Sequence, residues 1–397
     1  MQAFRCCRVG PGERFRCIAI SPSDLGAVVG TFERNFADRG ELGASVSIWW
    51  RGEEVLSLAH GWGNRQQTLE WSADTLVPVY SATKGPSSAC LLLALHDHGL
   101  GPETRVREVW ERFPLPEATF GHLLSHQCGL AVLDRRASVW KHDEAVAAIE
   151  EQAPRWRPGE GHGYHPRTFG PLIEEPLRRL TGQWPGAFWR ERIADPLGLD
   201  FWIGLPESEF GRVARLYPGK MEPGEPASDA FYRAYQTKGT ITRDAFFSPR
   251  GLQSIQEMND PGTWKIGFSA MGGVGTASSL AKFYQAALGV IDSPLPPALC
   301  RWLAERRVDG MDRVLLQPTS FGCGCQFDPL DPDGAKIRHL MGTSVDAFGH
   351  PGAGGSHAFG DPDSGLSFAY VMNQMDLSVL PGIKALSLVE ALYGMGG

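Results

Sequence analysis

Two spacings of hydrophobic residues follow each other near the start of the chain. Over positions 21–40 the apolar residues recur every three or four positions, which predicts an amphipathic helix. Ser21 has the side chain of a good N-cap, and Gly40 stands where this helix would end. Positions 44–50 and 54–60 then read as two strands with a short turn between them. The N-terminal part is therefore expected to form a helix and a β-hairpin.

The remainder of the chain has a helical middle and a strand-rich end. Further helices are expected at 81–95, 120–126, 145–149, 279–288 and 383–392, and further strands at 344–350, 355–359 and 366–373. Strands at both ends and helices between them predict an α/β domain, 21–80 plus 265–397, that is interrupted by a helical domain, 81–264. Residues 1–20 are expected to form a flexible arm.

The composition changes this picture only by exclusion. Hydrophobic residues make up 42% of the 397 positions and charged residues 21%, which excludes general disorder. The longest apolar run, Ala89–Leu95, is too short for a membrane span of roughly 20 residues. A net charge of −7 argues against nucleic acid or an anionic membrane as the main partner. The cysteines form no C-x-x-C pair and we expect no signal peptide, so a cytoplasmic protein is predicted.

Several common catalytic motifs do not occur in the sequence. It has no G-x-S-x-G, Walker, G-x-G-x-x-G or H-E-x-x-H motif, which weakens the case for an α/β-hydrolase, a P-loop enzyme, a dinucleotide-binding enzyme or a zinc protease. His122 and His126 are four positions apart, so one helical face could offer both to a metal. No third ligand accompanies them, and structural histidines are the favoured interpretation.

The pattern S-x-x-K places a hydroxyl and an amine one helical turn apart, and a desolvated amine can activate the serine as a general base. Ser81 is the favoured nucleophile because it opens a predicted helix, whose free N–H groups and dipole stabilise an oxyanion. Ser138 lies in a polar stretch, and Ser279 fits a surface or capping position. The three occurrences of the pattern are Ser81 with Lys84, Ser138 with Lys141, and Ser279 with Lys282.

Five motifs in order resemble the serine β-lactamase and penicillin-binding-protein superfamily, in particular its class C β-lactamase-like branch. The resemblance spans nearly the whole chain. It implies a β-lactamase-like fold, in which an antiparallel sheet is flanked by helices, an all-helical domain is inserted, and the active site lies in the cleft between them. The motifs are Ser81-x-x-Lys84, Thr119–Leu130, Pro158-Gly159 followed by Tyr164, Met271–Ala277 and Phe348–Gly355.

The resemblance also implies a role for each matched residue. Ser81 would be the acylated nucleophile, and Lys84 would help to remove its proton. Tyr164 would shuttle protons with Lys84, which as a cation could lower the pKa of the phenol. The N–H groups of Ser81 and Ala353 would form the oxyanion hole, since flanking glycines let the backbone approach closely. Pro351 cannot donate a ladder hydrogen bond, so its strand is expected at a sheet edge.

Two matched motifs depart from the β-lactamases of this branch. Their Tyr-x-Asn reads Tyr-His-Pro here, with the histidine at His165, and their Lys-Thr-Gly reads His-Pro-Gly, from His350 to Gly352. The lysine of the second motif helps to hold the carboxylate of a β-lactam, whereas a histidine is mostly neutral at pH 7. A histidine there is typical of family VIII carboxylesterases and related acyltransferases. His165, His350 and Gly352 are therefore expected to bind the substrate.

The leading hypothesis is a serine carboxylesterase that hydrolyses short- to medium-chain esters through an acyl-enzyme on Ser81. A β-lactamase or D-peptidase of the same fold, an acyltransferase, and an inactive scaffold remain as alternatives. The chemistry requires no metal and no organic cofactor. The expected partner is a small ester rather than nucleic acid or a membrane, and the sequence leaves the oligomeric state open.

Overall fold

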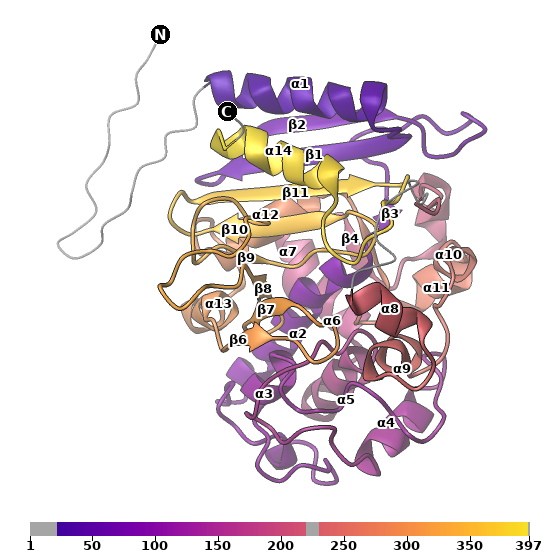
Figure 1. Cartoon of the computed structure of the whole chain (residues 1–397), viewed down its shortest axis with the longest axis vertical. Coiled ribbons are helices and arrows are strands. Elements are labelled where there is room, and N and C mark those ends of the chain that lie inside the picture. Colours follow the sequence, from indigo (N-terminus) through magenta and orange to yellow (C-terminus); the bar gives the residue numbers. More distant parts are fainter. Residues whose placement is uncertain (1–21, 220–229, 396–397) are drawn as a thin grey trace, which may run out of the picture.

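The structure is a computed structural model that describes residues 22–219 and 230–395. The predicted arm over residues 1–20 and the predicted N-cap Ser21 lie outside these ranges. Figure 1 shows an antiparallel sheet with helices on both faces in the upper half of the molecule and mostly helices in the lower half. This is the β-lactamase-like α/β arrangement that the sequence resemblance implies.

The first predicted helix and the predicted hairpin are both present. Helix α1 spans Pro22–Asp38, and the chain leaves it through Gly40, which has a φ of 64°. The hairpin strands are joined by Arg51 and Gly52, whose φ angles are 50° and 92°. Positive φ at both positions gives a turn whose twist matches that of the paired strands.

One sheet of eight strands combines both ends of the described chain. The N-terminal hairpin lies beside the C-terminal strand β11, so the two predicted strand regions share one sheet, as expected. Three of the strands were not predicted, because segments of two to four residues give no readable alternation. In sheet order the strands are β2 (Glu53–Gly61), β1 (Gly43–Trp50), β11 (Leu366–Met372), β10 (His357–Asp361), β9 (Phe348–Gly349), β8 (Gln326–Phe327), β7 (Pro318–Phe321) and β6 (Val308–Met311).

Helices cover both faces of this sheet (Figure 1). Helices α1 and α14 (Ile383–Tyr393) pack against each other over one face, and α12 (Ala277–Ala287) packs against the other. Side chains of α1, of β1 and β11, and of α14 form one buried hydrophobic cluster, which includes Phe32, Ile48, Phe368 and Leu388. Removal of this apolar surface from water, at about 25 cal/mol per Å², holds the layers together.

The middle of the chain is built around α2, which spans Lys84–Asp97 and is buried from Lys84 to Leu95. Helices α5 (Phe169–Thr181) and α13 (Pro297–Ala304) pack against it. The other described helices here are η2 (Val106–Glu108), α3 (Phe120–Leu124), α4 (His142–Glu150), α6 (Pro185–Trp189), η3 (Arg190–Ala194), α7 (Asp195–Leu197), η4 (Glu207–Arg212), α8 (Ala230–Gln236), α9 (Ile241–Phe247), α10 (Ile255–Met258) and α11 (Pro261–Ile266).

The middle segment was predicted to be all helical, and one short strand departs from that prediction. Strand β4 (Phe201–Ile203) pairs with β5 (Gly273–Gly275), which pairs in turn with β3 (Val77–Pro78). Glycine is required at this crossing, since a Cβ on Gly275 would lie 2.4 Å from the ring of Phe201. A strand of three residues has no periodicity that sequence patterns could reveal.

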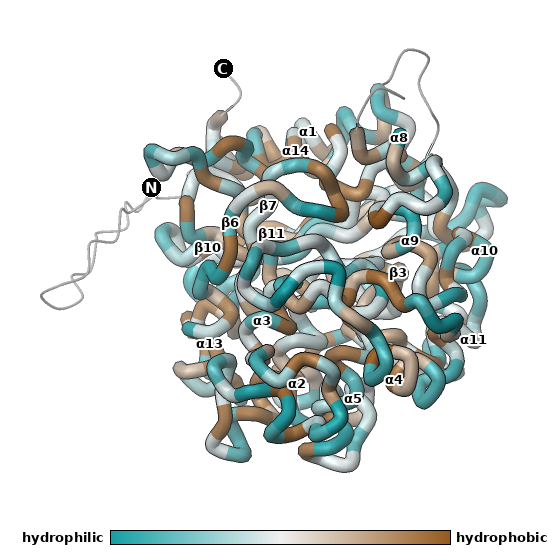
Figure 2. The backbone as a smooth tube through the Cα atoms, turned by 60° about the horizontal axis from the view of Figure 1, so that its bottom comes forward, coloured by the Kyte–Doolittle hydropathy of each residue, from teal (hydrophilic) through white to brown (hydrophobic). Residues whose placement is uncertain are grey.

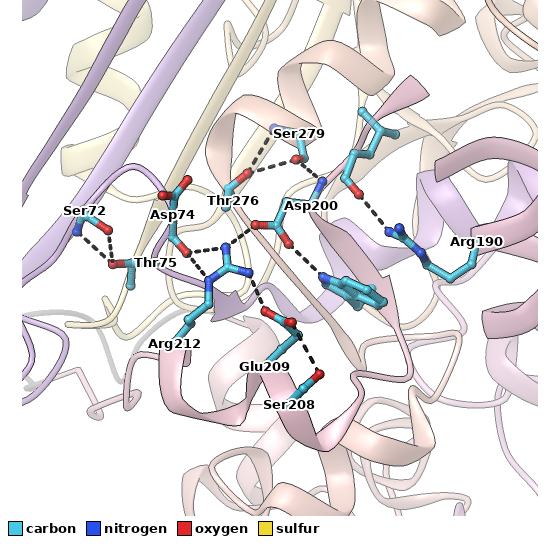
Figure 3. Close-up of polar contacts among 12 residues, drawn as sticks. Ser72, Asp74, Thr75, Arg190, Asp200, Ser208, Glu209, Arg212, Thr276 and Ser279 are labelled. Atoms are coloured by element: carbon cyan, nitrogen blue, oxygen red, sulfur yellow. Dashed lines mark hydrogen bonds and ion pairs between the residues drawn. The ribbon is translucent and has the colours of Figure 1, made fainter. Parts of the chain in front are cut away.

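A polar network joins the β4 region to the start of α12 (Figure 3). Arg212 donates hydrogen bonds to the carboxylates of Glu209 and Asp200. The backbone N–H of Asp200 donates to Ser279 Oγ at 2.7 Å, and Ser279 N donates to the N-cap Thr276 at 3.2 Å. Ser279, the serine of the third S-x-x-K pattern, therefore has a structural role in the first turn of this helix, although the N-cap is Thr276 and Ser279 is buried rather than at the surface.

The strand predicted at 344–350 differs from the one observed. Only Phe348 and Gly349 are in strand β9, and β9 lies between β10 and β8 rather than at an edge of the sheet. The edge prediction was wrong because Pro351 lies beyond the end of the strand, where its missing N–H costs no ladder hydrogen bond. His350 N still donates to Ala358 O at 3.0 Å. The chain before the strand forms a turn, in which Ser344 Oγ accepts from Asp346 N.

Hydrophilic segments lie over much of the outer surface, for example around α10 and α11 in Figure 2. Hydrophobic segments concentrate in the interior, where one large cluster extends from α2 to α12. Within the described ranges, every helix is too short or too polar to cross a membrane.

Candidate active site

Ser81 lies in a tight turn that leads into the buried helix α2. The turn is the 3-10 helix η1 (Tyr80–Thr83), and Tyr80 takes a φ of 49° within it. Thr83 Oγ1 donates to Tyr80 O at 2.5 Å and accepts from Gly273 N at 2.9 Å. Ser81 therefore precedes α2, rather than opening it as predicted, and the turn is fixed by β5 on one side and α2 on the other.

Lys84, in the first turn of α2, places its amine among three oxygen atoms. Its Nζ lies 3.2 Å from Ser81 Oγ, 2.8 Å from Ala270 O and 3.3 Å from Pro166 O. The side chain is completely buried. Burial, reinforced by the nearby positive charge of Arg167, holds the pKa of Lys84 well below its usual range. The structure thus favours a neutral amine beside the Ser81 hydroxyl.

Tyr164 contacts Ser81 from the loop that precedes helix α5. Its hydroxyl donates to Ser81 Oγ at 2.8 Å, and the Lys84 Nζ lies 4.9 Å from the centre of its ring. We expected the lysine to lower the pKa of this phenol, and that expectation is wrong. Burial raises the pKa of Tyr164 above its usual value, and it also disfavours the charged form of Lys84 that was to have lowered it.

Asp312 holds Tyr164 in place, a role that no sequence pattern indicated. The completely buried carboxylate accepts hydrogen bonds from Tyr164 N through both oxygen atoms, each at 3.1 Å. It also accepts from Val314 N, Leu315 N and Thr319 Oγ1 at 2.7, 2.8 and 3.0 Å. An aspartate that accepts from the amides two and three residues ahead is a readable turn signal. Its contact with Tyr164, which lies 148 residues earlier in the chain, cannot be read from the sequence.

The backbone around Ala353 lies close to the chain just before Ser81, at Gly352 and Val79. A Cβ on Gly352 would lie 2.0 Å from Val79 O, so only glycine permits this approach. On either side of Ala353, Gly352 N donates to Ser356 O at 2.6 Å and Gly354 N donates to Ser378 O at 2.9 Å. The amides of Ser81 and Ala353 have no acceptor among the described residues, and both residues line one cleft.

That cleft has a volume of about 280 Å³ and an aromatic wall. The rings on its α8 and α9 side pack against each other in edge-to-face or tilted pairs, with centroid separations of 5.2–5.9 Å. Ser81, Ala353 and Gly354 lie on the catalytic side, and Met271 and Met375 add further apolar surface. The five rings are those of Phe231, Tyr232, Tyr235, Phe246 and Phe247.

His165, predicted to bind substrate, lies behind the site instead. It is completely buried, its Nε2 accepts from Leu130 N at 3.0 Å, and its Nδ1 lies 2.7 Å from Gly163 O. Burial lowers its pKa to about 3, so the ring is neutral at pH 7. Both nitrogen atoms are occupied within the protein, so His165 fixes the loop that carries Tyr164. The Tyr-x-Asn comparison suggested substrate contact because it assigned the position by motif, without the local backbone.

His350 is also turned into the protein rather than onto the cleft wall. It is 2% exposed, its Nδ1 lies 2.7 Å from Pro351 O, and its ring centre lies 6.0 Å from that of Tyr164. Burial lowers its pKa to about 3. Like Gly352, it shapes the backbone near the cleft without lining it. The substrate-binding prediction for these two residues is corrected accordingly.

Arg167 lies beside the site and was not singled out from the sequence. It lines the cleft but is only 3% exposed, with Nε donating to Pro249 O at 2.7 Å and Nη1 to Leu252 O at 3.2 Å. Burial lowers its pKa to about 10, which still leaves the guanidinium cationic at pH 7. A lone arginine after a proline carries no sequence signal that distinguishes it from a surface arginine.

The other sequence candidates are not part of this arrangement. Ser138 Oγ accepts from Trp140 N, and its partner Lys141 pairs at the surface with Glu144 at 2.8 Å. His126 lies beyond the end of α3 with a φ of 63°, so it does not share a helical face with His122. Across the described ranges, His, Cys, Asp and Glu form no group of three that could hold a metal ion.

Comparison with known proteins places this geometry in context. The Beta-lactamase family model matches residues 30–391. The chain is 30% identical over 388 residues to the "Esterase/beta-lactamase LipL" of Mycobacterium tuberculosis, covering 92% of this chain and 85% of that protein. It is similar to the crystal structure of a penicillin-binding protein homologue from Caulobacter crescentus, with a TM-score of 0.81, 34% identity and coverage of 95% and 98%. A family VIII carboxylesterase structure has a TM-score of 0.81, 28% identity and the same coverage.

Proposed function

The chain belongs to the Beta-lactamase family. We propose that this protein is a carboxylesterase that hydrolyses small, uncharged esters through an acyl-enzyme on Ser81. It is a serine hydrolase of the esterase/beta-lactamase type. The proposal assigns the roles of Ser81, Lys84, Tyr164 and Ala353 in that hydrolysis.

Lys84 is the proposed general base. A neutral amine has two hydrogen atoms, which the carbonyl oxygens of Ala270 and Pro166 accept, and one lone pair, which then faces Ser81 Oγ. The amine takes the Ser81 proton as Oγ attacks the ester carbonyl carbon. The carbonyl oxygen becomes an oxyanion that accepts from the amides of Ser81 and Ala353.

Tyr164 is the proposed general acid. Its raised pKa keeps the phenol protonated, and its hydroxyl lies 2.8 Å from Ser81 Oγ, beside the carbonyl carbon from which the alkoxide leaves. It gives its proton to the leaving alkoxide, which departs as an alcohol, and the proton held by Lys84 returns to the tyrosine oxygen. In deacylation a water molecule gives a proton to the Lys84–Tyr164 pair as its oxygen adds to the acyl carbon. The bond between that carbon and Ser81 Oγ then breaks, Ser81 takes the proton back, and the carboxylic acid is released.

One observation carries the preference for uncharged esters, namely the state of the basic groups around Ser81. Among the described residues that line the cleft, Arg167 is the sole cation. It is only 3% exposed, and carbonyl oxygens accept from its Nε and Nη1, while its Nη2 has no partner in the described part of the chain. The neighbouring His350 is neutral, since its pKa is about 3. A carboxylate in the substrate would therefore lose its hydration with only this buried guanidinium as a cationic partner.

The cleft volume supports a small acyl group. About 280 Å³ is at the lower end of the roughly 300–1,000 Å³ of typical ligand sites. The aromatic wall provides apolar surface for a short or medium chain and resists expansion, because its rings are packed against each other. A cytoplasmic location, as predicted from the sequence, remains part of the proposal. The five described cysteines are free thiols, which is compatible with it.

A matched pair of chromogenic esters tests this proposal. p-Nitrophenyl butyrate and p-nitrophenyl succinate differ mainly by a terminal carboxylate, and we expect kcat/KM to be at least tenfold higher for the butyrate. A chromogenic cephalosporin, which carries a carboxylate, is expected to react more slowly than the butyrate. Faster turnover of the succinate or of the cephalosporin would contradict the assignment.

A further inference from the structure

The protein has a second cavity that is separate from the catalytic cleft. It has a volume of about 860 Å³ and shares no lining residue with the cleft. We call it the α4–α6 cavity, because its walls come from the start of α4, from α5, from the start of α6, and from the ends of β4 and α11. Helices α4 and α5 lie in the lower half of Figure 1.

Exposed tryptophans gather at this cavity. Trp140 is 42% exposed and Trp184 50% exposed, and both line it. Within the described ranges these are the two tryptophans with large exposed surfaces, and the 52% exposed Ile266 lines the cavity as well. A concentration of exposed apolar side chains in one concave site marks a place where a ligand or partner binds.

The ring of Trp184 is held in a fixed orientation. The guanidinium of Arg178 lies 4.2 Å from the ring centre, and the ring of His142 packs edge-on at 5.0 Å. His142 is itself clamped, with its nitrogen atoms 3.1 Å from Glu174 and 2.9 Å from Glu175. A half-exposed indole fixed in this way gives a ligand a flat surface at low entropic cost.

Two wall segments of the cavity cross at close range. A Cβ on Gly186 would lie 1.9 Å from Ile203 O, and one on Gly267 would lie 2.0 Å from Gly204 N. Glycine is therefore required at this crossing, which joins the start of α6 to the ends of β4 and α11.

The charges around the cavity argue against an anionic ligand. Lys141 pairs with Glu144 at 2.8 Å, Lys265 with Glu207 at 2.7 Å, and Arg178 with Glu175 at 3.6 Å. His142 has the two carboxylates described above, and these raise its pKa to about 9 against the opposing effect of burial. Each basic side chain of the cavity thus has an acidic partner, and none is left for an anion.

We infer that the α4–α6 cavity is a second, non-catalytic binding site for an uncharged aromatic molecule that stacks on Trp184 and Trp140. The fixed indole of Trp184 suits a planar ring, and the basic side chains of the cavity are already paired with carboxylates. The cavity is distinct from the catalytic cleft because the two share no lining residue.

The tryptophans themselves provide the test, since none of the described residues that line the catalytic cleft is a tryptophan. The full-length protein is labelled with 5-fluorotryptophan, and the ¹⁹F signals of Trp140 and Trp184 are assigned with the variants Trp140→Phe and Trp184→Phe. Titration with 2-naphthol is expected to shift both signals along one saturation curve. The signal of Trp302, on α13, is expected to stay unchanged.

Two variants test the site from opposite directions. Trp184→Ala removes the stacking surface, and Ala187→Phe fills the cavity from an exposed position on α6. Each is expected to weaken 2-naphthol binding at least about tenfold, roughly the loss of one aromatic stacking contact. The control Trp302→Ala is expected to bind the probe with unchanged affinity.

Three results would overturn the inference. The first is no shift of the Trp140 and Trp184 signals up to the solubility limit of 2-naphthol. The second is unchanged affinity in both Trp184→Ala and Ala187→Phe. The third is tighter binding of 2-naphthalenesulfonate, of 2-naphthyltrimethylammonium or of methyl β-glucoside than of 2-naphthol, which would assign the cavity to an anion, a cation or a sugar.

Discussion

The amine of Lys84 lies 2.8 Å from the carbonyl oxygen of Ala270, inside the protein and away from water. A carbonyl oxygen accepts a hydrogen bond without supplying a full negative charge, so it orients the amine while burial keeps the pKa low. Ala270 lies just before the glycine-rich strand β5 that braces the Ser81 turn. The same segment therefore positions the proposed base and the proposed nucleophile together.

Replacement of the amine tests the role of Lys84. Lys84→Met keeps an apolar stem of similar length in the buried helix but removes the proton acceptor. We expect kcat/KM for p-nitrophenyl butyrate to fall by about 10²–10⁴-fold, the usual contribution of a general base. The matched control is Lys282→Met, the lysine of another S-x-x-K pattern, which should stay within twofold. Equal losses in both variants would contradict the assignment.

The pH dependence of the reaction tests the protonation state of Lys84. The base must be neutral, so kcat/KM should rise with pH through a pKa of Lys84 that lies well below that of a free lysine. Arg167→Gln removes a positive charge that opposes protonation, which raises this pKa and should move the acid limb to higher pH, by up to about one unit. Arg167→Lys keeps the charge and should leave the limb in place. A shift to lower pH in Arg167→Gln would contradict this account.

A double-mutant cycle tests Asp312 as a positioning residue that acts through Tyr164. Asp312→Ala should lower kcat more than it affects KM, since the tyrosine loses two of the contacts that hold its backbone. Tyr164→Phe alone should cost about 10²–10³-fold in kcat through the lost proton donor. In the Tyr164→Phe background, Asp312→Ala should cause little further loss of kcat, although thermal stability still falls. Fully additive losses in kcat would show that Asp312 does not act through Tyr164.

The approach of Gly352 to Val79 tests the proposed oxyanion hole. Gly352→Ala forces a carbon toward Val79 O and should displace the Ala353 amide from Ser81. We expect kcat to fall by about 10²–10³-fold, the range seen when one oxyanion donor is lost. Gly26→Ala, in helix α1 with open space around it, is the matched control and should be neutral or slightly stabilising. Unchanged kcat in Gly352→Ala would contradict the role of Ala353.

The sequence predicted those features of this protein that depend on local pattern. Helix α1, the β1–β2 hairpin, helix α12 and the C-terminal strands β10 and β11 follow from periodicity and turn residues. The S-x-x-K context singled out Ser81, and the structure places Lys84 and Tyr164 within reach of its hydroxyl. The order of motifs indicated the family, which the comparisons confirm.

Features that depend on contacts between distant segments were missed. Asp312 and Arg167 meet the site only after folding, and the three-residue strand β4 has no period to detect. His165 and His350 were assigned by motif, but a motif does not reveal that both rings turn into the core. The pKa of Tyr164 was predicted in the wrong direction because the sequence cannot show that the phenol itself is buried, as the lysine beside it is.

Acylation of Ser81 is the central step of the proposed mechanism, and one mass measurement tests whether Ser81 is the nucleophile. The protein is treated with a p-nitrophenyl phosphonate ester and digested, and the adduct is located by mass spectrometry. We predict one adduct per chain, on Ser81, and its loss together with ester turnover in Ser81→Ala. An adduct on Ser138, Ser279 or another residue, or ester turnover that survives in Ser81→Ala, would contradict the account.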